Sequence, residues 1–232
     1  MKAITTLLLL LFCLTTLAQE RKFDFGFNVF PNFSLGVISN NGGFSPGEEA
    51  YKKMETWKPS ISGNVFVAYN LNEKSILGIG LGYQNNGERT HKIDLIFGNY
   101  PYTIPDPSLP THGKFVYNHH NIEIPIFYQR MIGNRFYAIA GTSIILNISN
   151  TVTSHKYFSN GSESISTSED ESTNFRRFNF TGNVGFGLNY LNKEKVKLFV
   201  HPYLQLGVLG ISKSAVFNRN ILSFGISTGI KF

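Results

Sequence analysis

The sequence is almost free of cysteine, which excludes a fold built on disulfides. Its one cysteine, Cys13, lies in the first 18 residues, and residues 19–232 contain none. An exported domain without disulfides needs another source of stability. A β-barrel closed within lipid is one such source, because every backbone polar group is paired there.

The sequence also lacks a second long apolar run. After residue 18, no segment has the roughly 20 consecutive apolar residues that a transmembrane helix needs. Hydropathy alone would therefore class residues 19–232 as soluble. Hydropathy does not detect membrane strands, because each strand carries a much weaker apolar signal than a helix.

Basic clusters and metal-ligand spacings are scarce as well. Removing Lys2 from the 21 basic residues leaves 20 against 15 acidic ones, and the basic residues are scattered, so we expect no nucleic-acid partner. His119 and His120 are adjacent and would point to opposite faces of a strand, so we interpret them as rim residues. No cofactor and no metal are expected. No Ser-His-acid or paired-carboxylate constellation stands out, and we expect no enzyme.

The first 18 residues have the form of a signal peptide. A positive start at residues 1–2 precedes an apolar run over 4–14, and small residues near 16–18 predict cleavage before Gln19. A membrane anchor is the first alternative, although the run is short for one. The second is a lipoprotein modified at Cys13, although Phe12 stands where a small residue is needed. We predict a signal peptide over 1–18 and one domain over 19–232.

Apolar and polar residues alternate along most of this domain. In the last segment, apolar residues at 222, 224, 226, 230 and 232 alternate with Ser, Gly and Lys. A two-residue period is that of a β-strand with one apolar face. It recurs in eight segments, at 23–37, 60–71, 77–84, 121–129, 136–148, 177–190, 196–208 and 220–232. In 136–148, either face could be the apolar one.

The links between these segments alternate in length. Tight turns rich in Asn and Gly lie at 70–74, 133–134 and 192–195. Longer loops are expected at about 39–58, 86–117 and 149–175, and a short link near 213–219. Short turns on one side and long loops on the other are typical of outer-membrane barrels. The sequence therefore predicts an all-β fold, an eight-stranded antiparallel up-and-down transmembrane β-barrel with both ends on the periplasmic side.

The polarity of the two faces favours a membrane barrel over a soluble one. A soluble eight-stranded barrel such as a lipocalin needs an apolar interior and a polar exterior. Here one face is dense in Phe, Ile, Leu and Val, and the other holds Gly, Ser, Asn and Gln. We expect lipid on the apolar face and a hydrogen-bonded plug inside.

Five ionisable residues fall on the predicted interior face and form our candidate lumen ion-pair network. A buried carboxylate needs a partner, and Glu123 is the carboxylate of the set. Its predicted cationic partners are Arg177, Lys197, His201 and Lys231. The alternative is that Glu123 is the acid or base of an enzyme. Replacement by Gln would separate the two, because a structural network predicts lost heat resistance without loss of a turnover.

Residues 117–144 resemble the PorT-like outer-membrane β-barrel family of Gram-negative bacteria. The resemblance is carried by Tyr117, by the Ile-Glu-Ile-Pro run at 122–125, by Gly133-Asn134 and by 137–141. It extends over 19–232 and implies a role linked to protein secretion and gliding. The last strand is similar to the signal read by barrel-assembly machinery, with Ile230 and Phe232 as its candidate residues and Ser227 where Gly is usual.

The sequence thus predicts an integral protein of the cell outer membrane with a structural, assembly or interaction role through its outer loops. Expected partners are outer-membrane lipid, the barrel-assembly machinery during insertion, and envelope or secretion-system proteins. An outer-membrane enzyme acting on lipid or peptide is the alternative. A soluble ligand-binding barrel is the third possibility.

Overall fold

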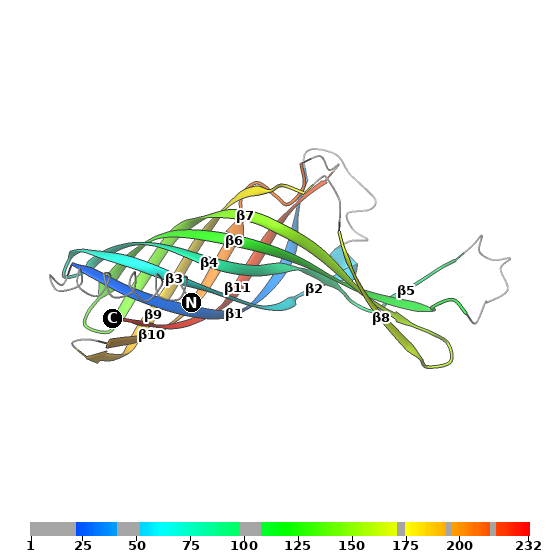
Figure 1. The fold of residues 1–232 in the computed structure, drawn as a ribbon, viewed down its shortest axis with the longest axis horizontal. Coiled ribbons are helices and arrows are strands. Elements are labelled where there is room, and N and C mark those ends of the chain that lie inside the picture. Colours follow the sequence, from blue (N-terminus) through cyan, green and yellow to red (C-terminus); the bar gives the residue numbers. More distant parts are fainter. Residues whose placement is uncertain (1–21, 41–51, 98–107, 171–174, 194–195, 214–216) are drawn as a thin grey trace, which may run out of the picture.

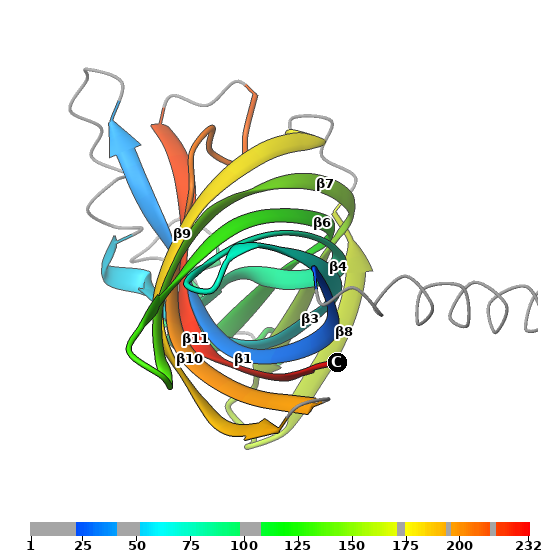
Figure 2. The same cartoon turned by 90° about the vertical axis from the view of Figure 1, so that its left-hand side faces the viewer.

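The computed structural model describes residues 22–40, 52–97, 108–170, 175–193, 196–213 and 217–232. Eight long strands form one closed antiparallel sheet (Figures 1 and 2). They are β1 (Phe23–Asn40), β3 (Lys58–Asn72), β4 (Ser75–Thr90), β6 (His112–Ile132), β7 (Phe136–Tyr157), β9 (Phe178–Lys193), β10 (Val196–Gly207) and β11 (Phe217–Lys231). Each strand of the ring pairs with its neighbour in sequence, and β11 pairs with β1 to close it. The predicted eight-stranded barrel is confirmed.

Three short strands lie beside the ring. They are β2 (Glu55–Thr56), β5 (Ile93–Asp94) and β8 (Glu163–Glu169), which pair with β4, β6 and β7 respectively. No helix in the described part of the chain is long and apolar enough to cross a membrane. The predicted signal peptide, 1–18, lies outside the described residues.

The expected long loops at 86–117 and 149–175 are partly wrong. β4 continues to Thr90, β6 already begins at His112, and β7 continues to Tyr157. The extensions of β6 and β7 pair with each other from the His112–Tyr157 pair inward, and the extension of β4 pairs with β6 as far as Arg89. Polar but β-branched residues such as Thr151 and Thr153 favour extended backbone, so the strands do not end where the apolar alternation ends. We call β5, β8, 112–120 of β6 and 149–157 of β7 the outer sheet; it projects from the barrel end opposite the short turns (Figure 1).

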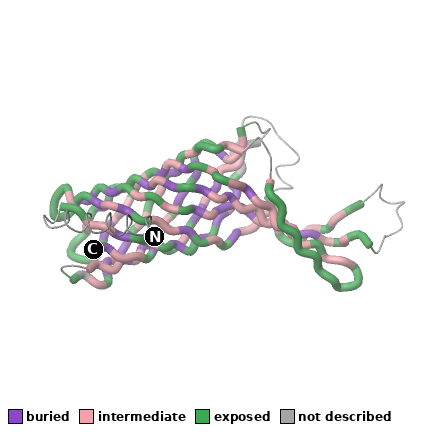
Figure 3. Tube along the Cα trace, viewed as in Figure 1, coloured by how far each residue is buried: buried purple, intermediate pink, exposed green. Residues whose placement is uncertain are grey.

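The apolar face points outward, as predicted. Buried and exposed positions alternate along the barrel strands (Figure 3). Val65 on β3 is 61% exposed, whereas its neighbour Phe66 is 5% exposed. In β7, whose orientation the sequence left open, Phe136, Leu146 and Ile148 are exposed. The lipid-facing set of that strand is therefore the even-numbered one.

Exposed aromatic residues gather near both ends of this apolar belt. At the end with the short turns, the rings of Phe23 and Tyr69 lie 5.1 Å apart, centre to centre. At the other end, the rings of Phe33 and Phe224 stack at 5.5 Å. Two aromatic girdles of this kind mark the two interfaces of an outer-membrane barrel.

The interior differs from the predicted polar plug near the short turns. Four inward aromatic residues form what we call the aromatic layer: Phe66, Phe127, Tyr137 and Phe199. Each lies directly across the sheet from a glycine; the four pairs are Gly26–Phe66, Gly78–Phe127, Gly187–Tyr137 and Gly229–Phe199. In every pair the ring occupies the place of the absent side chain, since a Cβ on the glycine would come within 2.6 Å of a ring atom.

Candidate functional site

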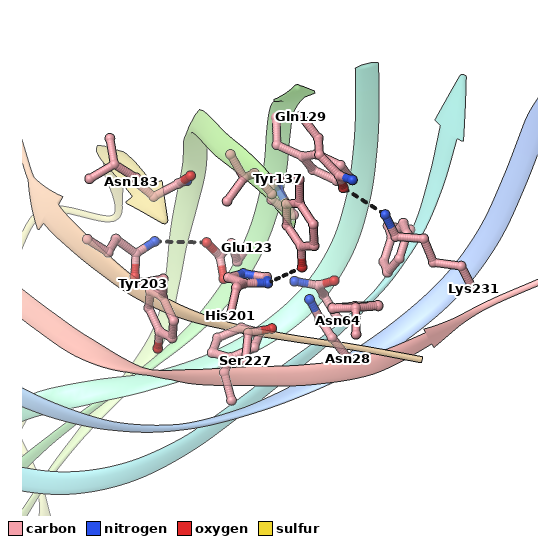
Figure 4. Close-up of a pocket in the computed structure, with 18 residues that line it drawn as sticks. Asn28, Asn64, Glu123, Gln129, Tyr137, Asn183, His201, Tyr203, Ser227 and Lys231 are labelled. Atoms are coloured by element: carbon pink, nitrogen blue, oxygen red, sulfur yellow. Dashed lines mark hydrogen bonds between the residues drawn. The ribbon is translucent and has the colours of Figure 1, made fainter. Parts of the chain in front are cut away.

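The aromatic layer encloses a buried cation. The ammonium of Lys231, on β11, lies 5.3 to 5.9 Å from the ring centres of Phe66, Tyr137 and Phe199. It donates a hydrogen bond of 2.7 Å to the side-chain oxygen of Gln129 (Figure 4). A desolvated cation is stabilised by ring faces and by one good acceptor. Lys231 therefore has a partner, but that partner is an amide and three rings.

A chain of amide hydrogen bonds crosses the middle of the barrel. Gln84 Nε2 on β4 donates to Gln205 Oε1 on β10 over 2.7 Å. Gln205 Nε2 donates in turn to Glu123 Oε1 on β6, at 3.0 Å, and to Thr181 Oγ1 on β9, at 2.9 Å. Cavities of about 80 Å³ and about 40 Å³ lie on its two sides, and Gln205 lines both. Side chains thus close the passage at this level.

The five residues of the predicted ion-pair network form no ion pairs with one another. Glu123, His201 and Lys231 do line one cavity, and Lys197 lies opposite Lys231 in the sheet. Glu123 bonds to an amide, and its Oε2 has no hydrogen-bond partner among the described residues. His201 is buried and shares a 2.9 Å hydrogen bond between Nδ1 and the Tyr137 hydroxyl. Lys197 pairs with Asp24 at 3.5 Å and is partly exposed.

Arg177 differs most from its predicted position. It is exposed and lies in the bend before β9, which begins only at Phe178. The alternation of that strand cannot be extended to it, because the chain leaves the sheet there. Arg177 is therefore not an interior residue.

A second buried charge cluster lies at the outer mouth of the barrel. Arg219 of β11 bonds to Glu88 of β4 and, at 3.5 Å, to Glu55 of β2. Tyr83 is the last exposed hydrophobic residue of β4, and no apolar side chain follows it over 84–90, so the cluster lies beyond the apolar belt. Burial raises the pKa of Glu88 to about 7, Arg219 opposes that shift, and Glu55 adds to it.

Sequence reasoning missed this cluster because its members fell in predicted loops. Glu55 was assigned to 39–58, Glu88 to 86–117 and Arg219 to 213–219. A loop residue carries no predicted face, so nothing in the alternation placed the three together. The available signal was Glu88 itself, the first charged residue after the uncharged stretch 75–87.

The two adjacent histidines point to opposite faces. His119 is buried and its Nδ1 lies 2.7 Å from Asn150 Oδ1. His120 faces outward, where its Nδ1 lies 2.5 Å from the Tyr83 hydroxyl. Within the described ranges, no three His, Cys, Asp or Glu side chains are placed to hold a metal ion.

The candidate assembly residues lie on the lipid-facing side of β11. Ile230 is opposite Phe27 of β1 and Leu198 of β10. Phe232 is 55% exposed, and its backbone exchanges hydrogen bonds with Phe25. Both side chains are therefore accessible from the membrane, and their role in assembly stays a prediction.

The outer sheet carries exposed polar pairs. His112 Nε2 lies 3.1 Å from Asp94 Oδ1, and His155 Nδ1 lies 2.8 Å from Glu163 Oε1. Such exposed pairs add little stability. Apart from Ile165, β8 exposes polar side chains, and the outer sheet is continuous with the barrel through β6 and β7.

The sequence profile of the family described as outer membrane protein beta-barrel domain matches residues 17–211. The chain belongs to this family. It is accordingly an outer-membrane β-barrel protein, located in the outer membrane. No curated protein matches the sequence of this outer-membrane barrel at a significant level.

Solved structures similar to this outer-membrane barrel are distant in sequence. Neisserial surface protein A is 14% identical, with 90% of this chain and 95% of that chain covered and a TM-score of 0.40. The attachment invasion locus protein Ail of Yersinia pestis, solved with a heparin analogue, is 8% identical, with 91% and 99% covered and a TM-score of 0.41. The outer membrane protease OmpT of Escherichia coli is 10% identical, with 91% and 96% covered and a TM-score of 0.42.

Proposed function

We propose that this protein is a surface interaction protein, in which the barrel anchors the outer sheet and the outer sheet binds another envelope protein. The supporting observation is the unequal length of the ring strands. β6 has 21 residues and β7 has 22, whereas β10 has 12. A strand of roughly 9–11 residues suffices to cross the membrane. The excess of β6 and β7 forms a paired platform outside it.

The closed interior favours this role over transport. Side chains of β4, β6, β9 and β10 meet across the lumen through Gln205. An eight-stranded barrel is just wide enough to be filled by its own side chains. We therefore expect no large steady conductance in planar-bilayer recordings, and such a conductance would contradict the filled interior.

The resemblance to PorT-like proteins supports a narrower proposal, in which the bound partner belongs to a protein-secretion system. The resemblance lies in strand and turn residues of β6 and β7, which are architectural. These two strands also carry the outer sheet. A secretion component is thus the first class of partner to test.

Site-specific photo-cross-linking in intact cells tests the proposed function. A photoreactive residue replaces Ile96, two residues after β5, or Ile165 of β8, which are 76% and 61% exposed. Val65, which is 61% exposed within the apolar belt, serves as the matched control. We expect one protein adduct of the same mass from both outer positions and none from Val65. Adducts with lipid alone, or none from either outer position, would refute the proposal.

A further inference from the structure

β8 is an open edge of the outer sheet. All seven of its residues, Glu163–Glu169, are exposed, and among the described residues it pairs only with β7. Natural sheet edges are usually protected by Pro, Lys or a bulge. The stretch Glu-Ser-Ile-Ser-Thr-Ser-Glu has no Pro and no Lys, and its pairing with β7 runs without a register shift.

The hydrogen bonds flanking β8 show which backbone groups face outward. The amide of Asp170 donates to the Asn150 carbonyl, and the Ser162 carbonyl accepts from the amide of Phe158. Backbone groups of even-numbered residues therefore point to β7, because successive residues of a strand alternate. The N–H and C=O groups of Glu163, Ile165, Thr167 and Glu169 point to the open edge.

The charges at the two ends of β8 disfavour a second copy of this chain. An antiparallel pairing of two β8 strands centred on Ser166 would place Glu163 opposite Glu169 twice. Like charges directly opposite each other destabilise a strand pair. A strand with a basic residue at each of these places would instead gain one favourable cross-strand pair with Glu169 and one with Glu163, whose Oε1 also lies 2.8 Å from His155 Nδ1.

We propose that the open edge of β8 binds an extended segment of a partner protein, which adds a strand to the outer sheet and carries Lys or Arg opposite Glu163 and Glu169. This inference rests on the proposed function and names the chemistry of the partner. Main-chain hydrogen bonds supply affinity in this mode, and alternate side chains supply specificity. Between the two basic residues, apolar or β-branched side chains lie opposite Ile165 and Thr167. Small residues lie opposite the serines of the other face.

A synthetic peptide tests the proposal. The probe is acetylated Lys-Thr-Val-Ser-Val-Thr-Lys amide with a fluorescent label, and its anisotropy is followed on titration with the full barrel in detergent. We expect saturable binding that weakens with added salt. A peptide with Glu in place of both Lys, and one N-methylated at both Val residues, are each expected to bind at least about tenfold more weakly, since one loses the charge pairs and the other the backbone donors.

Two variants of the barrel complete the test. Thr167→Pro removes an outward N–H and leaves the backbone hydrogen bonds to β7 in place, because Pro is tolerated on the open side of an edge strand. It also removes the side-chain hydrogen bond of Thr167 to Thr153 of β7, and the control variant removes that bond as well. Thr167→Val is the matched control that keeps the donor. We expect at least about tenfold weaker peptide binding for Thr167→Pro only. Heat-modifiable migration on gels verifies that both variants are folded.

The outcomes separate this inference from the proposed function. Equal binding by Thr167→Pro and wild type, or no saturable binding to the wild type, overturns strand addition at β8. If the cross-link from Ile96 then persists in cells, the outer sheet still binds a partner and only the edge mechanism fails. If the cross-links are absent as well, the proposed function fails with it.

Discussion

The aromatic layer predicts that a single methyl group at Gly187 destabilises the barrel. A Cβ at this position would lie 2.2 Å from Cζ and 2.5 Å from the hydroxyl of Tyr137. Ordinary van der Waals contact begins at 3.4 Å, so the ring must move by at least 1.2 Å. Tyr137 is only 1% exposed and its hydroxyl is bonded to His201, so a displacement of the ring strains or breaks that hydrogen bond.

The expected change in the free energy of unfolding combines two destabilising terms and one stabilising term. Overpacking a filled interior costs about 1–3 kcal/mol, and the hydrogen bond to His201 contributes about 1 kcal/mol. Replacing Gly by Ala restricts the unfolded chain, which returns about 0.4–1 kcal/mol. We therefore expect Gly187→Ala to lower the free energy of unfolding by about 2 kcal/mol.

Urea-induced unfolding in detergent or lipid vesicles measures this change. The matched control is Gly182→Ala, on the same strand but on the lipid-facing side, where a Cβ would meet no atom within 4 Å. The control should be as stable as the wild type or slightly more so. If Gly187→Ala and Gly182→Ala unfold at the same urea concentration, Tyr137 does not occupy the space over Gly187 and our account of the aromatic layer is wrong.

Three further predictions concern buried charges. Glu123→Gln should leave the free energy of unfolding within about 1 kcal/mol of wild type or raise it, because the carboxylate has no cationic partner. A loss above about 2 kcal/mol, measured by urea unfolding, would mean that such a partner exists. Gln129→Leu should lower the free energy of unfolding by about 2 kcal/mol, because it removes the acceptor of the Lys231 ammonium. Adding Lys231→Met should recover at least half of this loss. Additive losses in this double-mutant cycle would contradict the pairing. The folded-state pKa of Glu88 is raised from 4.5 to about 7, so its contribution to stability is full below pH 4.5 and is lost as the pH rises towards 7. The pH dependence of the urea midpoint over this window should flatten in Glu88→Gln, and an unchanged slope would refute the assignment.

The closed barrel was predictable from sequence because lipid imposes a simple pattern. Residues such as Val65, Leu81 and Phe224 face a uniform apolar solvent, so most outward positions are apolar and the two-residue period is clear. The faces of seven strands follow from that period. β7 was ambiguous because Tyr137, Ile139 and Ile145 make its inward face apolar too.

The interior was less predictable because its side chains pack against other side chains of the protein and not against a uniform apolar medium. Phe66, Phe127 and Phe199 lie between outward apolar residues, so the local sequence shows an apolar run with no alternation. Their inward position depends on a glycine that is distant in sequence and opposite in register, such as Gly78 for Phe127. Likewise, the partner of Glu123 is an amide on another strand, and charge alone pointed to the cations instead.

The pairing of β1 with β11 has a consequence for biogenesis. Asn40 is opposite Phe217 and Gly26 is opposite Lys231, so the final seam joins residues that are far apart in the chain. Seven hairpin pairings can form successively as the polypeptide is delivered, but the eighth waits for the last strand. Until then, the sheet has two unpaired edges, at β1 and at the last strand added, and both must be shielded from hydrocarbon. Any chaperone or insertase that handles this protein therefore has to bind both edges at once.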